Sequence, residues 1–454
     1  MTVRYFLDPF GCVKNQVDAE TMMACLNNSG WTAADDPGGA DLIIVNSCGF
    51  IESAKRESIN AVLGWRKLYP DKKILLAGCL SQRYRAELAE SLPEADVLFG
   101  NTDLARISAA ADRALGREPR REPEAAETAA GPGHAGPSAG GVVPISTPGQ
   151  RPLLSLPGSA YVKISEGCNN RCAFCAIPLI RGSLVCRPVP DILAECQELL
   201  RRGVREINLI GQDTGSYRAP GAGLPDLLEA LSALEGRFWV RLLYIHPDNF
   251  PLPILDIMAR DRRFLPYFDI PFQHGSAKIL AAMNRRGNAE TYLRLLETIR
   301  GRLPGAAIRS TFMTGFPGET DEDFAALLDF QERARLDWLG CFTFSPEEDT
   351  DACAMKNRVS KKIAAARRLL VEERQTPLTE KNMDRFTGKT YEALVEEKIE
   401  GEAGLYLGRL SCQAPEVDGA TVIHCGDDRR LEPGTLVRTK VFARTGFDLQ
   451  ARAG

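Results

Sequence analysis

Short apolar runs alternate with helical patterns along the first 116 residues. The runs VRYFLDPF, DLIIVN (41–46) and KILLA (73–77) predict strands, and the segments 15–29 and 50–69 between them predict helices. A repeated strand–helix rhythm favours a parallel sheet that is covered by helices. The sequence therefore predicts an N-terminal three-layer parallel α/β domain over residues 1–116.

A second alternating region covers residues 159–383. Its six candidate strands are YVKIS, REINLIG, VRLLYIH, YFDIPF, IRSTFMTG and LGCFTF, and helical patterns separate them at about 190–202, 224–235, 252–261, 276–303 and 320–335. A run of βα units of this length can curl into a partial (βα)6 barrel. Such barrels place their active sites at the C-terminal ends of the strands.

Two further segments differ from these in pattern. Residues 384–454 hold short β-prone pieces with turn signals, which predict a small antiparallel barrel or sheet. Residues 117–158 are rich in Glu, Ala, Gly and Pro, and residues 131–150 alone contain ten Gly or Pro, too many for a regular element. We interpret 117–158 as a flexible linker without chemistry of its own.

The composition of the 454-residue chain narrows the function. Hydrophobic residues make up 44% and charged residues 26%, as in a globular protein. Lys and Arg total 56 against 60 Asp and Glu, a net charge of −4, so no global basic field is present to hold nucleic acid. No apolar run approaches the roughly 18 residues of a membrane span, and the N-terminus lacks the apolar centre of a signal peptide. We expect a cytoplasmic protein with no membrane partner.

Thirteen cysteines and four histidines indicate that any metal is held mainly by sulfur. The sharpest motif is the C-x3-C-x2-C run of Cys168, Cys172 and Cys175, which directly follows the first strand of the second region. Three such thiolates can hold three corners of a cubane iron–sulfur cluster and leave one iron open. The alternatives are a structural zinc site, for which no nearby fourth ligand is evident, or inert thiols.

Three further cysteines are spread over the first domain. Cys12, Cys48 and Cys79 each follow one of its predicted strands, and each has a glycine beside it. Because parallel strands all point the same way, residues just past their ends can converge at one edge of the sheet. This predicts a second three-cysteine site, although a cysteine after a strand is more often a small buried hydrophobe.

Polar residues at the strand ends of the second region are weaker candidates. Gln212 and Asp213 end the second strand, Gln273 and His274 end the fourth, and Arg309 lies within the fifth. Their side chains could reach a cofactor or substrate at the mouth of the barrel. Polar residues in such positions also cap loops and helices.

The motif C-x3-C-x-Φ-C, in which the aromatic residue Φ is Phe174, resembles the radical S-adenosylmethionine superfamily. That resemblance implies that S-adenosylmethionine binds the open iron beside Phe174. From their strand positions, Gln212, Gln273 and Arg309 are our further candidates for cofactor contacts. The chain as a whole resembles the methylthiotransferase branch, in which a three-cysteine domain, a radical SAM barrel and a small OB-like TRAM barrel follow one another. The branch implies two 4Fe-4S clusters, the second on Cys12, Cys48 and Cys79 supplying sulfur, with S-adenosylmethionine as both methyl donor and radical source.

Short sequence segments indicate which members of this branch the chain resembles. GCVKNQVDAE, KISEGCNNRCAFCAIPLIRG, LIGQDTGSY, TGFPGETDEDF and APEVDG are similar to the RimO-type members, which modify the β-carbon of an aspartate in small-subunit ribosomal protein twelve. The alternative is a MiaB-like enzyme acting on a tRNA adenosine. Residues 384–454 carry 10 Lys or Arg and 12 Asp or Glu, a net charge of −2, whereas a module that reads tRNA backbone is expected to be basic.

The resemblance therefore predicts a ribosomal-protein partner and an unidentified electron donor, with tRNA less favoured. Val13, Cys186 and Asp349 depart from the expected pattern in loops, and none of them is a predicted cluster ligand. A rival of another class is a non-catalytic iron–sulfur or zinc scaffold whose C-terminal barrel binds RNA.

Overall fold

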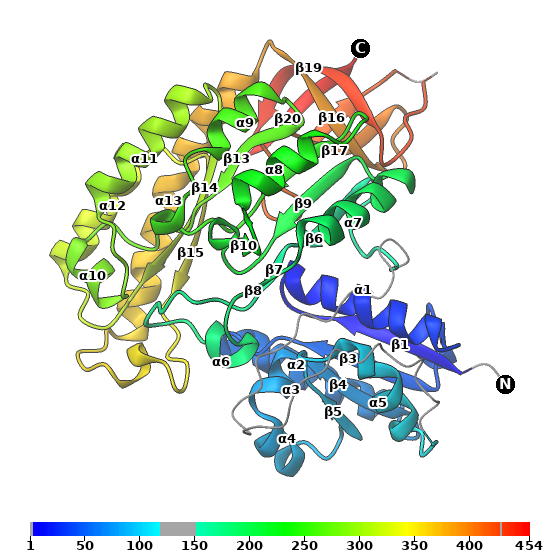
Figure 1. Cartoon of the computed structure of the whole chain (residues 1–454). Helices are drawn as coiled ribbons and strands as arrows, with labels where there is room; N and C mark the ends of the chain where they lie inside the picture. The colour runs from blue at the N-terminus through cyan, green and yellow to red at the C-terminus, as the bar shows by residue number, and fades with distance from the viewer. Residues whose placement is uncertain (1–2, 119–150, 427–428) are drawn as a thin grey trace. The chain divides into compact units, whose positions relative to one another are not determined.

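The computed structural model describes residues 3–118, 151–426 and 429–454, which form two compact units (Figure 1). Unit 1 comprises Met1–Leu154, Glu166–Asn170 and Ala176–Val185, and unit 2 comprises Ser155–Ser165, Arg171–Cys175 and Cys186–Gly454. The domain boundary at residue 159 stays a prediction. The two compact units do not follow it, because two pieces of the loop after the first barrel strand pack with the N-terminal domain. Most of the predicted linker, residues 119–150, lies outside the described residues.

Unit 1 is built on a five-stranded parallel sheet with the order β2-β1-β3-β4-β5. Its strands are β1 (Arg4–Pro9), β2 (Thr32–Ala33), β3 (Leu42–Ser47), β4 (Lys73–Gly78) and β5 (Val97–Phe99). Its helices are α1 (Val13–Asn28), α2 (Glu52–Leu68), α3 (Cys79–Arg83), α4 (Arg85–Ser91), α5 (Ile107–Ala114) and α6 (Ile177–Arg181). The predicted strand–helix rhythm is confirmed.

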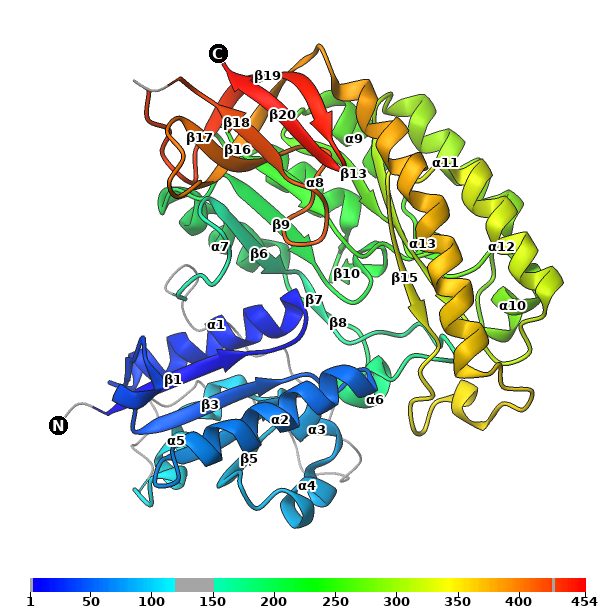
Figure 2. The same cartoon turned by 180° about the vertical axis from the view of Figure 1, so that it is seen from behind.

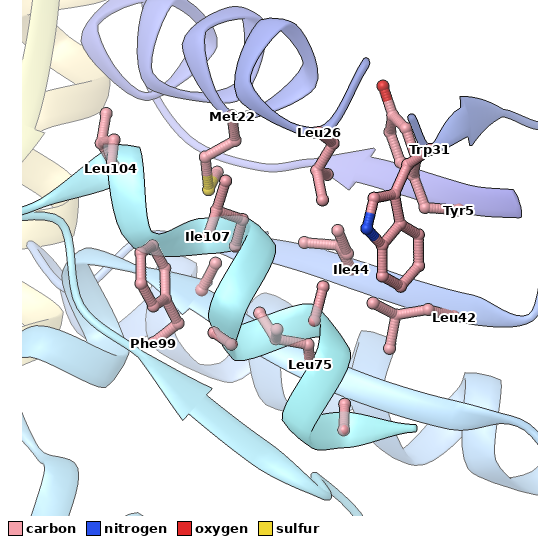
Figure 3. Close-up of a cluster of buried hydrophobic side chains, with 14 of the residues drawn as sticks. Tyr5, Met22, Leu26, Trp31, Leu42, Ile44, Leu75, Phe99, Leu104 and Ile107 are labelled. Atoms are coloured by element: carbon pink, nitrogen blue, oxygen red, sulfur yellow. The ribbon is translucent and has the colours of Figure 1, made fainter. Parts of the chain in front are cut away.

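Helices cover both faces of this sheet, because its strands carry apolar side chains on both faces, as in β3. Leu42 and Ile44 pack into a core with residues of α1 and α5, which Figure 3 shows around Met22, Leu26 and Ile107. The alternate residues of β3, Ile43 and Val45, pack into a second core with residues of α2, α3 and α4. Successive side chains of a strand point to opposite faces, so an uninterrupted apolar run is buried on both sides. The result is the three-layer arrangement expected from the sequence.

Unit 2 contains a six-stranded parallel sheet with the order β15-β14-β13-β12-β9-β6. Its strands are β6 (Ser159–Lys163), β9 (Glu206–Ile210), β12 (Trp239–Leu242), β13 (Phe264–Asp269), β14 (Ala307–Thr314) and β15 (Trp338–Thr343). The sheet does not close on itself, because β15 and β6 stand at its two ends. It is the partial (βα)6 barrel that the sequence predicts.

Helices follow the strands in the predicted order. They are α7 (Val189–Arg201), α8 (Leu224–Ser232), α9 (Ile254–Arg260), α10 (Ala277–Ala282), α11 (Ala289–Arg302), α12 (Asp321–Ala334) and α13 (Lys361–Met383). Figure 2 shows α13 running along β15. Short two-residue strands lie in the loops: β7 (Ser165–Glu166), β8 (Val185–Cys186), β10 (Arg218–Ala219) and β11 (Ala222–Gly223). No helix among the described residues has the length and apolar character needed to cross a membrane.

The C-terminal part of unit 2 is a closed five-stranded barrel with the order β16-β17-β18-β20-β19. Its strands are β16 (Thr390–Lys398), β17 (Leu405–Leu410), β18 (Thr421–His424), β19 (Leu436–Thr445) and β20 (Asp448–Ala453). The barrel is predicted as antiparallel, and four of its pairings are, but β18 and β20 pair in parallel. This parallel pair completes the closure of the barrel, which removes the exposed edges of so small a sheet.

Buried ion pairs join this barrel to the central sheet. Glu206 at the start of β9 is bound by Arg241 of β12 at 2.9 Å and by Arg409 of β17 at 2.5 Å, and all three side chains are almost fully buried. Burial alone would raise the pKa of Glu206, but the two guanidinium groups lower it to about 2. The carboxylate is therefore ionised at neutral pH, and it fixes the small barrel at the N-terminal end of the sheet strands.

Candidate functional site

Unit 1 brings Cys12, Cys48 and Cys79 to one edge of its sheet. Cys12 follows β1 and is the N-cap residue of α1, Cys48 follows β3, and Cys79 is the first residue of α3 directly after β4. The three strands are neighbours and parallel, and their last residues lie side by side in the registers Pro9–Asn46 and Ser47–Gly78. Residues that directly follow them therefore meet at the C-terminal edge of the sheet.

The glycines beside the cysteines permit this approach. A Cβ atom on Gly11 would lie 3.0 Å from the Cβ of Cys48, and Gly11 has a positive φ of 94°, which an L side chain rarely adopts. A Cβ atom on Gly49 would lie 2.7 Å from the carbonyl oxygen of Cys79. The loops of Cys12 and Cys48 thus each pack against the next cysteine because glycine leaves the space open.

The three thiols sit in graded environments. Cys12 is exposed, Cys48 is half-buried and Cys79 is buried. Burial raises the pKa of Cys79 to about 12, against the opposing charge of Arg181, and the nearby Cys12 and Cys48 add to the rise. Burial and the proximity of Cys12 also raise the pKa of the Cys48 thiol. The trio therefore runs from the surface into the protein, with Cys79 as its innermost member.

In unit 2 the loop that carries Cys172 and Cys175 is fixed by backbone hydrogen bonds. The Cys175 N–H donates to the carbonyl of Cys172 at 3.0 Å. Ala173 donates to the carbonyl of Met283 at 3.0 Å and accepts from the N–H of Ala352 at 2.8 Å. Phe174 packs against an apolar cluster of Ala173, Ile279, Met283, Phe316 and Ala352. These contacts fix the loop against the rest of unit 2.

A histidine and an arginine that the sequence analysis missed stand beside this loop. The Nε2 atom of His246 lies 3.8 Å from the Sγ atom of Cys172, and the Arg285 guanidinium lies 6.0 Å from the centre of the Phe174 ring. Burial, and then the charge of Arg285, lower the pKa of His246 to about 4, so its ring is neutral at physiological pH. His246 is the last residue of the predicted strand VRLLYIH, and its strand-end position was the available signal.

The predicted polar residues at the ends of β9 and β13 share this end of the sheet. Gln212 follows β9, and Asp213 accepts the His246 N–H at 3.0 Å, which holds His246 in place. Gln273 has a φ of 70°, and its backbone bonds to Thr311 and Met313 at 2.8 Å each. Within the described part of the chain its buried Oε1 atom has no hydrogen-bond partner. An unused buried acceptor of this kind fits a bound polar ligand.

Two other candidates have different surroundings. Arg309 lies near the start of β14, and its Nη1 atom donates to Asp418 of the C-terminal barrel at 2.7 Å, together with the carbonyl of Val417. Since the strands are parallel, this is the opposite end of the sheet from Gln212 and Gln273. His274 accepts the Ser276 N–H at 2.9 Å, and burial lowers its pKa to about 3. The structure does not bring Arg309 to the predicted cofactor end.

Cys168, the first cysteine of the contiguous motif, belongs to unit 1. Its N–H donates to the carbonyl of Gly182 at 3.2 Å, and the loop continues into α6, which packs against α3. No group of three or more His, Cys, Asp or Glu side chains within 3–118, 151–426 and 429–454 is gathered around a single metal-ion position. A cubane differs from a single ion, because each cysteine binds a different iron. By chemistry alone, a set of three thiols suits a cluster with one corner open.

Three family models match consecutive parts of the chain. Residues 4–100 match the uncharacterized protein family UPF0004, residues 162–330 match the radical SAM superfamily, and residues 387–453 match the TRAM domain. A ribosomal protein uS12 methylthiotransferase RimO of Treponema denticola is 46% identical over 98% of this chain and 100% of its own. The chain belongs to the RimO family. The RimO of Syntrophomonas wolfei is 38% identical over 97% of each chain.

Solved structures of low sequence identity share the fold. The radical S-adenosylmethionine methyltransferase TsrM of Kitasatospora setae superposes with a TM-score of 0.53 at 14% identity, covering 77% of this chain and 74% of its own. The predicted radical SAM fold and membership of the RimO family are confirmed. As a radical SAM methylthiotransferase, this RimO-family chain uses S-adenosylmethionine and [4Fe-4S] clusters.

Proposed function

We propose that this RimO-family chain transfers a methylthio group to the β-carbon of an aspartate in ribosomal protein uS12. The observation that carries the proposal is the convergence of Cys12, Cys48 and Cys79 at one sheet edge, which gives unit 1 a sulfur-rich site of its own. The full-length similarity to chains named uS12 methylthiotransferases supports the choice of substrate.

Each trio of cysteines has a role in this proposal. Cys168, Cys172 and Cys175 hold the cluster that binds S-adenosylmethionine, and Cys12, Cys48 and Cys79 hold the cluster at which sulfur is delivered. When bound, these groups supply one-electron chemistry, which an aliphatic C–H bond requires because it offers neither an acidic proton nor a leaving group.

The chain's own residues prepare the cofactor end of unit 2. Phe174 and its apolar cluster exclude water from one side of the Cys172 loop. His246 stays neutral beside Cys172, so it adds no positive charge there, and Asp213 fixes its backbone. The buried Oε1 atom of Gln273 can accept a hydrogen bond from an amino group of S-adenosylmethionine.

The partners follow from the same proposal. A ribosomal protein is a basic substrate, and the net charge of −2 on residues 384–454 suits it better than a tRNA backbone. The chemistry consumes electrons, so an electron donor of unidentified kind is a second partner. A ribosomal protein substrate implies a cytoplasmic location for this enzyme.

The test uses a bacterial strain in which the gene for this protein is deleted. Mass spectrometry of uS12 and of tRNA from that strain should show loss of the methylthio group from uS12 alone. Complementation with the wild-type chain or with Cys25→Ala should restore it, whereas Cys79→Ala should not. Both cysteines lie in unit 1, but Cys25 is near the C-terminal end of α1 and packs against the core, whereas Cys12 of the trio caps the N-terminal end of the same helix. A modified uS12 with an unmodified tRNA adenosine in the deletion strain would establish the MiaB-like alternative.

A further inference from the structure

Arg181 at the end of α6 is a buried cation in contact with the innermost cysteine of unit 1. Its Nη2 atom donates to the Sγ atom of Cys79 at 3.1 Å, to Asn15 Oδ1 at 2.7 Å and to Asp18 Oδ2 at 2.9 Å. Its Nη1 atom donates to Glu166 Oε1 at 2.9 Å, and the Arg181 side chain is only 3% exposed. One planar guanidinium thus contacts four partners, and because Nη2 carries only two hydrogens, its three acceptors share them.

The residues next to Arg181 contact the other cysteine motif. The Gly182 carbonyl accepts the N–H of Cys168 at 3.2 Å. Gly167, with a φ of 74°, packs so closely there that a Cβ atom would lie 2.7 Å from the Gly182 carbonyl oxygen. Residues 181 and 182 therefore touch Cys79 through a side chain and Cys168 through the backbone, all within unit 1.

A thiolate at Cys79 would be stabilised by a nearby positive charge. The Cys79 residue is buried, and a buried negative charge is costly unless it is paired. Asn15 and Asn101 contact its sulfur at 3.2 and 3.4 Å. A cluster ligand must nevertheless be a thiolate. A fixed cation at 3.1 Å offsets that cost, while Asp18 and Glu166 keep the guanidinium aimed at the sulfur.

We propose that Arg181 is a positioning residue of the three-cysteine site, which stabilises anionic sulfur at Cys79 and fixes the turn that carries Cys168. This inference rests on the proposed function, because it assigns a cluster to Cys12, Cys48 and Cys79. The inference goes beyond that function, because it means that the same short segment, Arg181 and Gly182, holds both Cys79 and Cys168 in place. Groups that hydrogen-bond to metal ligands orient them and tune the metal, and their loss commonly lowers metal affinity by about 10–100-fold.

The test isolates the second cluster in the full-length chain. A parent carrying Cys168→Ala, Cys172→Ala and Cys175→Ala is reconstituted with iron and sulfide, and its iron content, reduction potential and electron paramagnetic resonance spectrum are measured. Arg181→Met should weaken iron binding by about 10–100-fold and make the potential more negative, because a nearby positive charge favours the reduced cluster. Asp18→Asn should move the potential the opposite way, since it removes a negative charge.

A matched control separates charge from stability. Arg151 forms a fully buried ion pair with Glu20 in the same unit, and Arg151→Met should leave the potential and spectrum of the bound cluster unchanged. Equal potentials in all variants, or shifts of the same sign for Arg181→Met and Asp18→Asn, would overturn the role of Arg181. If Arg181→Met retains no iron, the sign of the Asp18→Asn shift decides. A parent that binds no iron at all would instead refute the second cluster itself and thus the proposed function.

Discussion

The two cysteine trios of this protein are assembled in different ways. Cys168, Cys172 and Cys175 occupy one loop of eight residues, whereas Cys12, Cys48 and Cys79 come from three separate strand ends. The spacing of the first trio depends on local backbone, supported by hydrogen bonds such as that from Cys175 to Cys172. The spacing of the second depends on the register of β1, β3 and β4 and on the glycines between the loops. A motif within one loop can be recognised from spacing, but a dispersed site exists only once the sheet has formed.

The largest expected effect comes from the loop trio. Cys172→Ala should abolish production of 5′-deoxyadenosine from S-adenosylmethionine and dithionite, because one ligand of the radical cluster is lost. The measurement is liquid chromatography of reaction products with anaerobically reconstituted protein. Cys353→Ala, which removes another half-buried thiol of unit 2, is the control and should keep full production. Undiminished 5′-deoxyadenosine from Cys172→Ala would show that this trio does not hold the radical cluster.

The dispersed trio should fail in a different way. Cys79→Ala should lower the iron content from about eight to about four atoms per chain, because only one [4Fe-4S] cluster then forms. Production of 5′-deoxyadenosine should persist, while methylthiolation of uS12 stops. Iron analysis and mass spectrometry of uS12 measure the two effects, with Cys25→Ala as the unit 1 control. Loss of both activities together would mean that the trios are not separable sites.

Sequence patterns predicted most of the fold because its signals are local. The apolar run of β3 and the six strands of unit 2 each lie within a few residues of their predicted positions. The parallel pairing of β18 with β20 was not predicted, since strand order around a barrel depends on contacts far apart in sequence. The predicted boundary at residue 159 differs from the contact pattern for the same reason: α6 packs against α3 of the N-terminal domain.

The candidate site was predicted unevenly for a related reason. The six cysteines were proposed from spacing and strand ends, and they stay a prediction. Arg181 was not proposed, although it lies in the quoted string AIPLIRG. Nothing local shows that its side chain contacts Cys79, which is 102 positions away. We predicted Arg309 at the cofactor end of the sheet only because it lies in a barrel strand. It lies near the start of β14, and its side chain binds Asp418. The end of a strand on which a residue lies therefore matters as much as the strand itself.

A change remote from both trios should reduce stability without emptying either cluster. Glu206→Gln leaves Arg241 as a buried cation without its carboxylate and Arg409 with Glu396 alone, which should cost about 3–5 kcal/mol of unfolding free energy. Because the folded pKa of Glu206 is lowered to about 2, its contribution is present at neutral pH and is lost as the pH falls from its ordinary value toward the folded one. Urea denaturation between pH 7 and pH 3 should show that the unfolding free energy of the variant falls less with decreasing pH than that of the wild type.

The control for that change is an exposed ion pair. Glu229→Gln removes the partner of Arg260 on the surface and should cost no more than about 1 kcal/mol. Iron content should equal that of the wild type in both variants. A Glu206→Gln protein as stable as Glu229→Gln would show that the small barrel does not depend on the buried pairs.

The smallest effect tests whether the dispersed trio depends on backbone proximity alone. Gly49→Ala places a methyl group 2.7 Å from the Cys79 carbonyl oxygen and 2.9 Å from the Leu80 nitrogen, so the two loops must separate. Overpacking of this kind costs about 1–3 kcal/mol, and the shifted Cys79 should leave about four irons per chain, those of the loop trio. Gly64→Ala is the matched control, because its added methyl group on α2 meets nothing within 4 Å and should stabilise the helix by up to about 1 kcal/mol. If Gly49→Ala instead retained about eight irons, the glycine contacts would not be what holds Cys48 and Cys79 at cluster-binding distance.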